Sequence, residues 1–219
     1  MTGAGSLREQ VAAACRALAQ AGLVRATSGN VSAREGDRVA ITPTGGVLGE
    51  LTADQIVVVD LDGAVVEGSL APTSEIALHL GVYRRYGAGA VVHTHAPVAT
   101  ALSIVVDELP CVHYEMLALG GAIRVAPYRT FGTPELAEVV LDALDGRTAA
   151  LMANHGALNY GTDIDTAVDG ALLLEWACEV YWRAAALGEP RALGEEDRQA
   201  VIEAAAQRSY GTTRKAGEA

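Results

Sequence analysis

Ala90-Val-Val-His93-Thr-His95 is a short apolar run that ends in two histidines separated by one residue. Successive side chains of a β-strand point to opposite faces, so in a strand both imidazoles lie on the same face. Neutral imidazole is the commonest transition-metal ligand among protein side chains. The stretch therefore predicts a strand that carries half of a metal site.

Two further residues complete a ligand set of the type that zinc uses. His155 follows the apolar run at residues 148–153, and Glu75 lies where a helix is expected to begin. Three histidines at strand ends and one carboxylate would leave one position exchangeable for substrate. A histidine considered alone is more often a capping or hydrogen-bonded residue than a ligand, so the prediction depends on the whole set.

The composition favours one soluble domain. With 219 residues, half of them hydrophobic, the chain is long enough for one sizeable core. The balance of 16 basic and 27 acidic residues gives a formal charge of −11, which argues against nucleic acid or an anionic membrane as a partner. We find no signal-peptide pattern and no membrane-spanning apolar run, and the three cysteines are far apart, so we expect a cytoplasmic protein with reduced thiols.

Signals for hairpins and helices alternate along the chain. A capping box from Ser6 to Glu9 opens an amphipathic helix that ends near Gly22. Two hairpins are expected at residues 31–42 and 56–67, the second with the two-residue turn Asp62-Gly63. Helices are expected at residues 74–87, 97–105, from 133 onward, 163–187 and 195–207. This order predicts an α/β domain with a mixed sheet covered by helices on both faces.

Three loops contain groups that can bind an anion without arginine. The loops are Thr27 to Asn30, Thr44-Gly45 and Thr73-Ser74. They offer hydroxyls, a side-chain amide or backbone N–H groups, and the third lies at a helix N-terminus, where the dipole favours an anion. The same residue types are also ordinary turn and cap residues, and Glu75 could equally complement the helix dipole.

Five short motifs are spread along the chain. They are Thr27-Ser-Gly-Asn-Val-Ser32, Ile41-Thr-Pro-Thr-Gly45, Pro72-Thr-Ser-Glu75, Val92-His-Thr-His95 and Asn154-His-Gly156. In this order they resemble the class II aldolase/adducin-head family, which includes L-fuculose-phosphate aldolase and L-ribulose-phosphate 4-epimerase. The likeness covers essentially residues 6 to 211. Three more segments look like the fuculose-phosphate aldolase branch, namely Val112-His-Tyr114, Tyr128-Arg-Thr-Phe-Gly-Thr133 and Ser209-Tyr-Gly211.

The resemblance implies a fold and a ligand set. The fold is a three-layer α/β/α arrangement with a central mixed, largely antiparallel sheet covered by helices on both faces. One Zn²⁺ per subunit would be bound by His93, His95 and His155, with Glu75 as a fourth ligand that the substrate displaces. The residues implied to hold the substrate phosphate are Ser28, Gly29, Asn30, Thr44, Gly45, Thr73 and Ser74.

The resemblance also implies a homotetramer with active sites between subunits. Tyr114 would donate a proton from a neighbouring subunit, and Tyr210 would close the site from the C-terminal tail. We therefore expect one class II aldolase-like domain at residues 1–208 and a mobile tail at residues 209–219.

The reaction implied is retro-aldol cleavage of a phosphorylated ketose. The substrate would be L-fuculose 1-phosphate or a related deoxy-ketose 1-phosphate, and the products dihydroxyacetone phosphate and an aldehyde. A chelating Zn²⁺ would stabilise the enediolate that remains after the C–C bond breaks. With the metal in this role no lysine Schiff base is required, and Glu75 would move the proton at the dihydroxyacetone-phosphate carbon.

Three alternatives stay open. L-Ribulose-5-phosphate 4-epimerases of the family tend to carry Asp at the position of Glu75 and a His-Ala-Asp segment near residues 112–114, and this chain has neither. A methylthioribulose-1-phosphate dehydratase has the same type of zinc site. A non-catalytic module like the adducin head resembles the fold but lacks the metal histidines, so zinc content distinguishes it from the enzymes.

Two other histidines have no assigned role. His79 lies four residues after Glu75, so it can face the same side of the helix, either behind a metal ligand or as a packed core residue. His113 beside Tyr114 is as well suited to orient its loop as to take part in chemistry.

Overall fold

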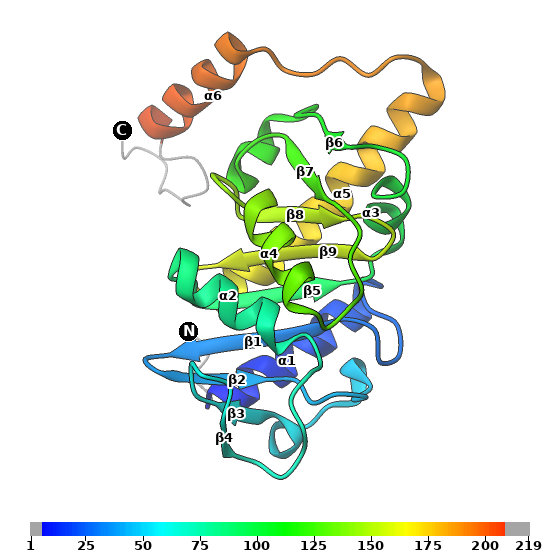
Figure 1. The fold of residues 1–219 in the computed structure, drawn as a ribbon. Helices are drawn as coiled ribbons and strands as arrows, with labels where there is room; N and C mark the ends of the chain where they lie inside the picture. Colours follow the sequence, from blue (N-terminus) through cyan, green and yellow to red (C-terminus); the bar gives the residue numbers. More distant parts are fainter. Residues whose placement is uncertain (1–5, 209–219) are drawn as a thin grey trace.

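Nine strands form one sheet in residues 6–208, the part of the chain that the computed structural model describes (Figure 1). The strands are β1 (Asn30–Glu35), β2 (Arg38–Ile41), β3 (Val57–Val59), β4 (Val65–Glu67), β5 (Ala90–Thr94), β6 (Glu108–Leu109), β7 (Ile123–Ala126), β8 (Ala149–Met152) and β9 (Gly156–Gly161). They lie in the order β4-β3-β2-β1-β5-β9-β8-β7-β6. The pair β7 and β8 is parallel and the other pairs are antiparallel. The largely antiparallel mixed sheet is thus confirmed.

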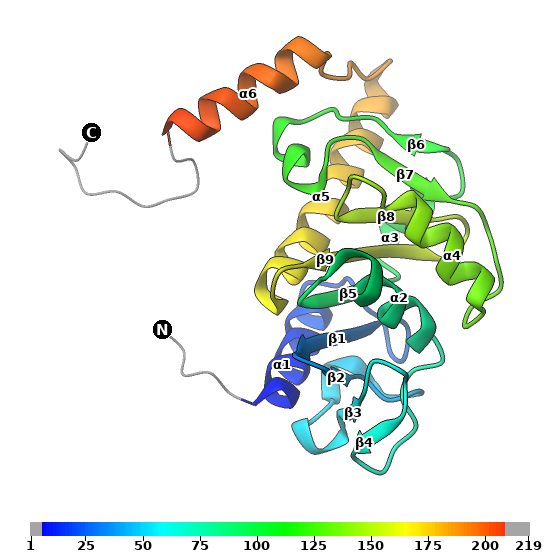
Figure 2. The same cartoon turned by 60° about the vertical axis from the view of Figure 1, so that its left-hand side comes forward.

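Helices cover both faces of this sheet. They are α1 (Leu7–Gln20), α2 (Ile76–Tyr86), α3 (Pro97–Leu102), α4 (Pro134–Ala143), α5 (Ile164–Leu187) and α6 (Glu195–Arg208), together with the short 3-10 helices η1 (Leu48–Glu50), η2 (Ala53–Gln55) and η3 (Tyr114–Leu119). Helices α1, α3 and α5 pack on one face, whereas α2 and α4 pack on the other (Figure 2). The predicted three-layer α/β/α architecture is therefore confirmed.

Successive side chains of β5 point to opposite faces of the sheet, so each packs against a different set of helices. Ala90 and Val92 belong to the core beneath α1 and α5, and Val91 belongs to the core beneath α2 and α4. His93 shares the face of Val91, because residues two apart in a strand point the same way. Asn30 of β1 is the register partner of His93 and also faces α2. The α2 face of the sheet consequently carries His93 of β5 and Asn30 of β1.

Local sequence signals place several helix ends correctly. Ser6 and Glu9 form the predicted capping box of α1, Gly87 ends α2 in the left-handed conformation, and Asp163 caps α5. Helix α2 begins at Ile76, slightly later than predicted, with Glu75 as its N-cap residue.

The turn between β3 and β4 is wider than the predicted two-residue turn. Residues 60–64 separate the two strands. The carboxylate of Asp60 accepts the N–H groups of Asp62 and Ala64, and backbone bonds from Gly63 to Asp60 and from Asp60 to Ala64 also close the loop.

The sequence patterns do not predict β6, β7 or β9. Strand β9 begins and ends with glycine, which forms strands poorly. It nevertheless lies between the apolar strands β5 and β8. A Cβ atom at Gly156 would collide with the carbonyl oxygen of Thr94, so this glycine permits the close approach of β9 to β5.

Two further predictions concern membrane-spanning segments and the C-terminal tail. No helix of residues 6–208 is long and apolar enough to cross a membrane. The predicted mobile tail at residues 209–219, with Tyr210, lies outside the described residues.

Candidate active site

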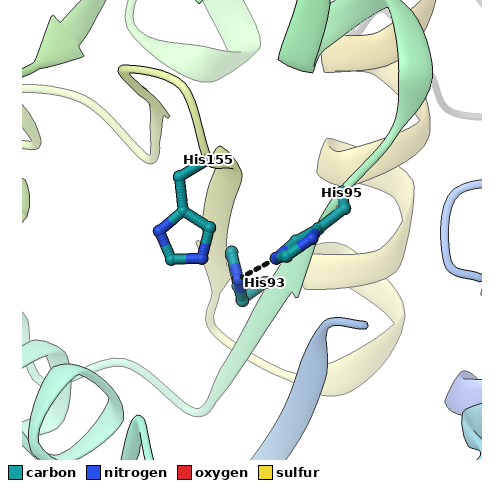
Figure 3. A group of neighbouring side chains, drawn as sticks. All are labelled: His93, His95 and His155. Carbon is teal, nitrogen blue, oxygen red and sulfur yellow. Dashed lines mark hydrogen bonds between the residues drawn. The ribbon is translucent and has the colours of Figure 1, made fainter. Parts of the chain in front are cut away.

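His93 and His95 stand at the end of β5, where their rings point toward each other (Figure 3). Their Nε2 atoms lie 3.0 Å apart. His93 is fully buried, whereas His95, one residue beyond the strand, is half-buried. The strand thus fixes one imidazole in the core and leaves the other accessible.

His155 approaches the same point from the turn between β8 and β9 (Figure 3). Asn154 before it has φ +56°, a left-handed conformation that asparagine adopts more readily than most residues. Thr94 pairs with Ala157, and this register brings His155 beside His95. The ring centroids of the three histidines are 4.9 Å apart in every pair.

The carboxylate of Glu75 closes the cluster from the N-terminus of α2. Its Oε2 lies 3.2 Å from Nε2 of His93, and its Oε1 lies 3.5 Å from Nε2 of His155. Oε2 also accepts a hydrogen bond of 2.8 Å from Nδ2 of Asn30. Oε1 is buried and has no hydrogen-bond partner among the described residues. A buried carboxylate oxygen without a donor is the expected state of an atom that binds a cation.

The hydrogen bonding of His93 suits metal binding. Its Nδ1 lies 2.9 Å from the carbonyl oxygen of Ala157, and since a carbonyl can only accept, Nδ1 carries a proton. Nε2 then faces the cluster, as in histidine ligands whose other nitrogen donates to a carbonyl.

The spacing of the donor atoms also fits a metal ion. Tetrahedral ligands at zinc bond lengths of about 2.0–2.2 Å lie roughly 3.3–3.5 Å from one another. Nε2 of His93 lies 3.0 Å from Nε2 of His95 and 3.2 Å from Oε2 of Glu75, and Nε2 of His155 lies 3.5 Å from Oε1 of Glu75. One ligand atom from each of the three histidines lies within 4.8 Å of the others. His93, His95 and His155 therefore form a site suited to a divalent metal.

Burial and mutual charge set the protonation of these groups in the metal-free protein. Burial opposes ionisation of Glu75, but the neighbouring His93, the bond from Asn30 and His155 together hold its pKa below the usual range. Burial lowers the pKa of His95 and of His155 to about 4, helped by His93. Burial also acts to lower the pKa of His93, but Glu75 raises it above the ordinary value. Below the raised pKa of His93, a metal ion would compete with a proton for this residue.

A cavity of about 490 Å³ adjoins the metal ligands, and His95, His155 and Glu75 form part of its wall. The three hydroxyl-rich loops form another part. Their lining residues include Ser28, Gly29, Asn30, Thr44, Gly45, Thr73 and Ser74. The structure thus brings the seven residues predicted to bind phosphate to one cavity beside the ligand cluster.

Some polar groups of these loops are already hydrogen-bonded within the protein. The N–H of Thr44 bonds to Ala71 and the N–H of Thr73 bonds to Thr42. Their hydroxyls are the donors left for a ligand. The side chain of Asn30 is engaged at both ends, because Nδ2 donates to Glu75 and Oδ1 lies 2.5 Å from Nε2 of His79. Its role in phosphate binding stays a prediction.

Gly29 permits a close approach between the first loop and β5. It has φ +91°, and an added Cβ would lie 2.7 Å from the carbonyl oxygen of His93. No L-residue with a side chain fits this position without a shift of one of the two segments. The loop and the metal ligand are therefore positioned together.

The structure does not bring Tyr114 to this cavity. It lies in η3 with 38% of its surface exposed, and its ring centroid is 4.5 Å from that of His113. Within residues 6–208 the cavity wall does not include it. Tyr210, the other predicted catalytic tyrosine, lies outside the described residues.

Tyr128, Arg129 and Asn154 also line the cavity, and their local sequence did not assign them a role there. The segment between β7 and α4 supplies the first two. Arg129 is the one Lys or Arg in the described cavity wall. Asn154 is part of the Asn154-His155-Gly156 motif, but the sequence did not predict its left-handed φ or its position in the cavity wall.

A comparison with known protein families shows which family the chain belongs to. Residues 9–182 match the model of the Class II Aldolase and Adducin N-terminal domain. The chain belongs to this family. The resemblance of its five motifs to this family is thereby confirmed.

Relatives of this class II aldolase cover almost its whole length. A 5-deoxy-D-ribulose 1-phosphate aldolase of Bacillus thuringiensis serovar kurstaki is 37% identical over 195 residues, 88% of this chain and 92% of that protein. An L-fuculose phosphate aldolase of Escherichia coli is 39% identical over 198 residues, 90% of this chain and 92% of that protein. A solved L-fuculose 1-phosphate aldolase superposes with a TM-score of 0.87 at 34% identity, over 92% of this chain and 97% of that chain.

These relatives also confirm the predicted class of protein. They are named aldolases, and aldolases are lyases. The chain is accordingly an enzyme of the class II aldolase type, and its histidine cluster provides the divalent-metal site that such enzymes use.

Proposed function

We propose that this class II aldolase is zinc-dependent and cleaves a ketose 1-phosphate to dihydroxyacetone phosphate and an aldehyde. The observation that carries the proposal is the convergence of three imidazole nitrogens and one carboxylate beside a hydroxyl-lined cavity. Nitrogen and oxygen donors at near-tetrahedral spacing favour Zn²⁺, with one ion per subunit.

The substrate is a small phosphorylated ketose, L-fuculose 1-phosphate or a related deoxy-ketose 1-phosphate. This choice is supported by the names of the relatives, which act on L-fuculose phosphate and on 5-deoxy-D-ribulose 1-phosphate. Hydroxyls of Ser28, Thr44, Thr73 and Ser74 would bind the phosphate together with backbone N–H groups of the loops, including that of Gly45.

The residues divide the proton transfers between them. When bound, the metal supplies a Lewis acid that stabilises negative charge on the substrate oxygens after C–C cleavage. Tyr114 of a neighbouring subunit moves the proton of the hydroxyl whose oxygen becomes the aldehyde carbonyl. Glu75 returns a proton to the carbon that loses its bond, and Oε1 is the oxygen assigned to this transfer because Oε2 already accepts from Asn30.

A homotetramer with shared sites would bring Tyr114 to the cavity of the next subunit and let Tyr210 close that cavity. Support comes from the position of Tyr114, which is well exposed and lies away from the described cavity wall of its own chain. The measurement is the mass of the purified protein in solution. A catalytically active monomer would contradict the shared site.

The test is a coupled assay for dihydroxyacetone phosphate. The protein is assayed with L-fuculose 1-phosphate, 5-deoxy-D-ribulose 1-phosphate, methylthioribulose 1-phosphate and L-ribulose 5-phosphate, each with and without a chelator. Release that the chelator abolishes and Zn²⁺ restores is the expected result. Epimerisation of ribulose 5-phosphate, or dehydration of methylthioribulose 1-phosphate, without release would overturn the proposed reaction. Failure to bind Zn²⁺ after metal-replete purification would overturn the metal site.

A further inference from the structure

A chain of buried polar side chains runs from Glu75 into the layer between β1 and α2. Nδ2 of Asn30 donates to Oε2 of Glu75 over 2.8 Å, and Oδ1 of Asn30 lies 2.5 Å from Nε2 of His79. Nδ1 of His79 lies 2.6 Å from Oγ of Ser32, which lies 2.6 Å from the hydroxyl of Tyr83. His79 and Ser32 are 0% exposed and Tyr83 is 1% exposed, so water does not compete for these bonds.

The residue spacing in β1 and in α2 brings these hydrogen-bonded side chains together. Asn30 and Ser32 are two apart in β1 and share the face toward α2. Glu75, His79 and Tyr83 are four apart and lie along one side of α2. The alternate residue Val31 packs in the opposite core. A polar stripe of the helix therefore lies directly against a polar stripe of the strand.

The direction of each hydrogen bond can be worked out from Glu75. Asn30 uses Nδ2 for the carboxylate, so its Oδ1 must accept from Nε2–H of His79. Complete burial favours the neutral ring of His79 over the charged one, and the single proton of the neutral ring is the one on Nε2. Its Nδ1 then accepts from the Ser32 hydroxyl, and Ser32 accepts from the Tyr83 hydroxyl. Every donor in the chain points toward Glu75, an arrangement in which successive bonds strengthen one another.

We propose that Asn30 and His79 are positioning residues for Glu75, with Ser32 and Tyr83 fixing the tautomer of His79. The chain holds Oε2 and thereby turns Oε1 toward His155, 3.5 Å away, where it faces the metal site. The inference rests on the proposed metal site. It gives His79 a function beyond that of a packed core residue.

A matched pair of substitutions separates positioning from packing. In His79→Gln the side-chain amide lies near the position of Nε2, so the donor to Asn30 is kept. In His79→Asn the amide lies near the position of Nδ1, so contact with Ser32 is kept and the donor to Asn30 is lost. Both replace an imidazole by a neutral amide, and thermal unfolding of the metal-free proteins controls for general destabilisation.

The readouts are affinity for Zn²⁺, by competition with a chromophoric chelator, and the visible absorption of the Co²⁺-substituted protein, which reports the ligands of the ion. We expect His79→Asn to lose about 10–100-fold in Zn²⁺ affinity and to change the Co²⁺ spectrum. His79→Gln should restore both toward the wild-type values. Equal effects of the two substitutions, or no effect of His79→Asn, would overturn the proposal.

Ser32→Ala is a second test that hardly changes the volume of the core. It removes the hydroxyl that donates to Nδ1 of His79, so we expect weaker Zn²⁺ binding in a protein that still folds. If Ser32→Ala binds Zn²⁺ with wild-type affinity, the proposal that Ser32 fixes the tautomer of His79 is overturned. This result is decisive even if both His79 variants fail to fold. Wild-type protein that binds no Zn²⁺ would instead refute the proposed metal site, so the two failures are distinguishable.

Discussion

Replacing Gly29 with alanine should destabilise the protein and displace a metal ligand. Gly29 has φ +91°, and a left-handed conformation costs a residue with a Cβ roughly 1–2 kcal/mol. The new Cβ would lie 2.7 Å from the carbonyl oxygen of His93 and 3.1 Å from Cγ1 of Val24. Overpacking of this kind costs about 1–3 kcal/mol. We therefore expect the free energy of unfolding to fall by about 2–5 kcal/mol.

Gly36→Ala is the matched control. Gly36 also has a positive φ, +58°, but nothing lies within 4 Å of an added Cβ. Only the backbone penalty applies there, so Gly29→Ala should lose about 1–3 kcal/mol more than Gly36→Ala. The assay is urea unfolding of the metal-free proteins at one protein concentration, because assembly would shift the midpoint. Equal losses in the two variants would refute the steric argument.

The same pair of variants tests the link between the loop and the metal site. The atom nearest to the new Cβ is the backbone oxygen of His93, so relief of the clash should move that ligand. We expect Gly29→Ala to bind Zn²⁺ more weakly in chelator competition and Gly36→Ala to bind it as wild type does. Loss of stability with unchanged affinity would mean that the strain is relieved toward Val24 instead.

Three other experiments test the site and the core. Glu75→Gln keeps the side-chain size but removes the carboxylate that transfers the proton, so kcat should fall by about 10²–10⁴-fold. Full activity of the metal-loaded variant would exclude Glu75 from this proton transfer. Acidification should weaken metal binding, because the raised pKa of His93 lets a proton occupy that ligand from above pH 6.5 downward. Competition titrations should show the logarithm of affinity falling by about one per pH unit, and an affinity independent of pH would contradict this. Burial raises the pKa of Cys15 to about 12 and also raises that of Cys178. A thiol reagent should therefore label both cysteines only after unfolding. Rapid labelling of the native protein would contradict their burial in the core.

The sequence by itself determined the local structure and the chemical type of the site. The Ser6 capping box, the glycine after α2 and the Asp163 cap act within one turn of a helix, so their effect can be read from neighbouring residues. The spacing of His93 and His95 is likewise local, since a strand fixes which side chains share a face. The five ordered motifs that contain these histidines, Glu75 and the hydroxyl-rich loops also indicated the family, which the match over residues 9–182 bears out.

Only the tertiary structure decided which distant groups meet and in which direction they bond. Strand β9 has a weak sequence signal and forms because apolar strands lie on both sides of it. Asn30 is placed among the phosphate-binding residues by its motif, yet its amide is oriented by Glu75 and His79, which lie 45 and 49 residues away along the chain. A hydrogen-bond direction depends on the partner at each end, and those partners are set by packing of β1 against α2. The sequence could therefore point to the side chains that cluster as candidate metal ligands, but not to the buried hydrogen-bonded side chains that hold Glu75.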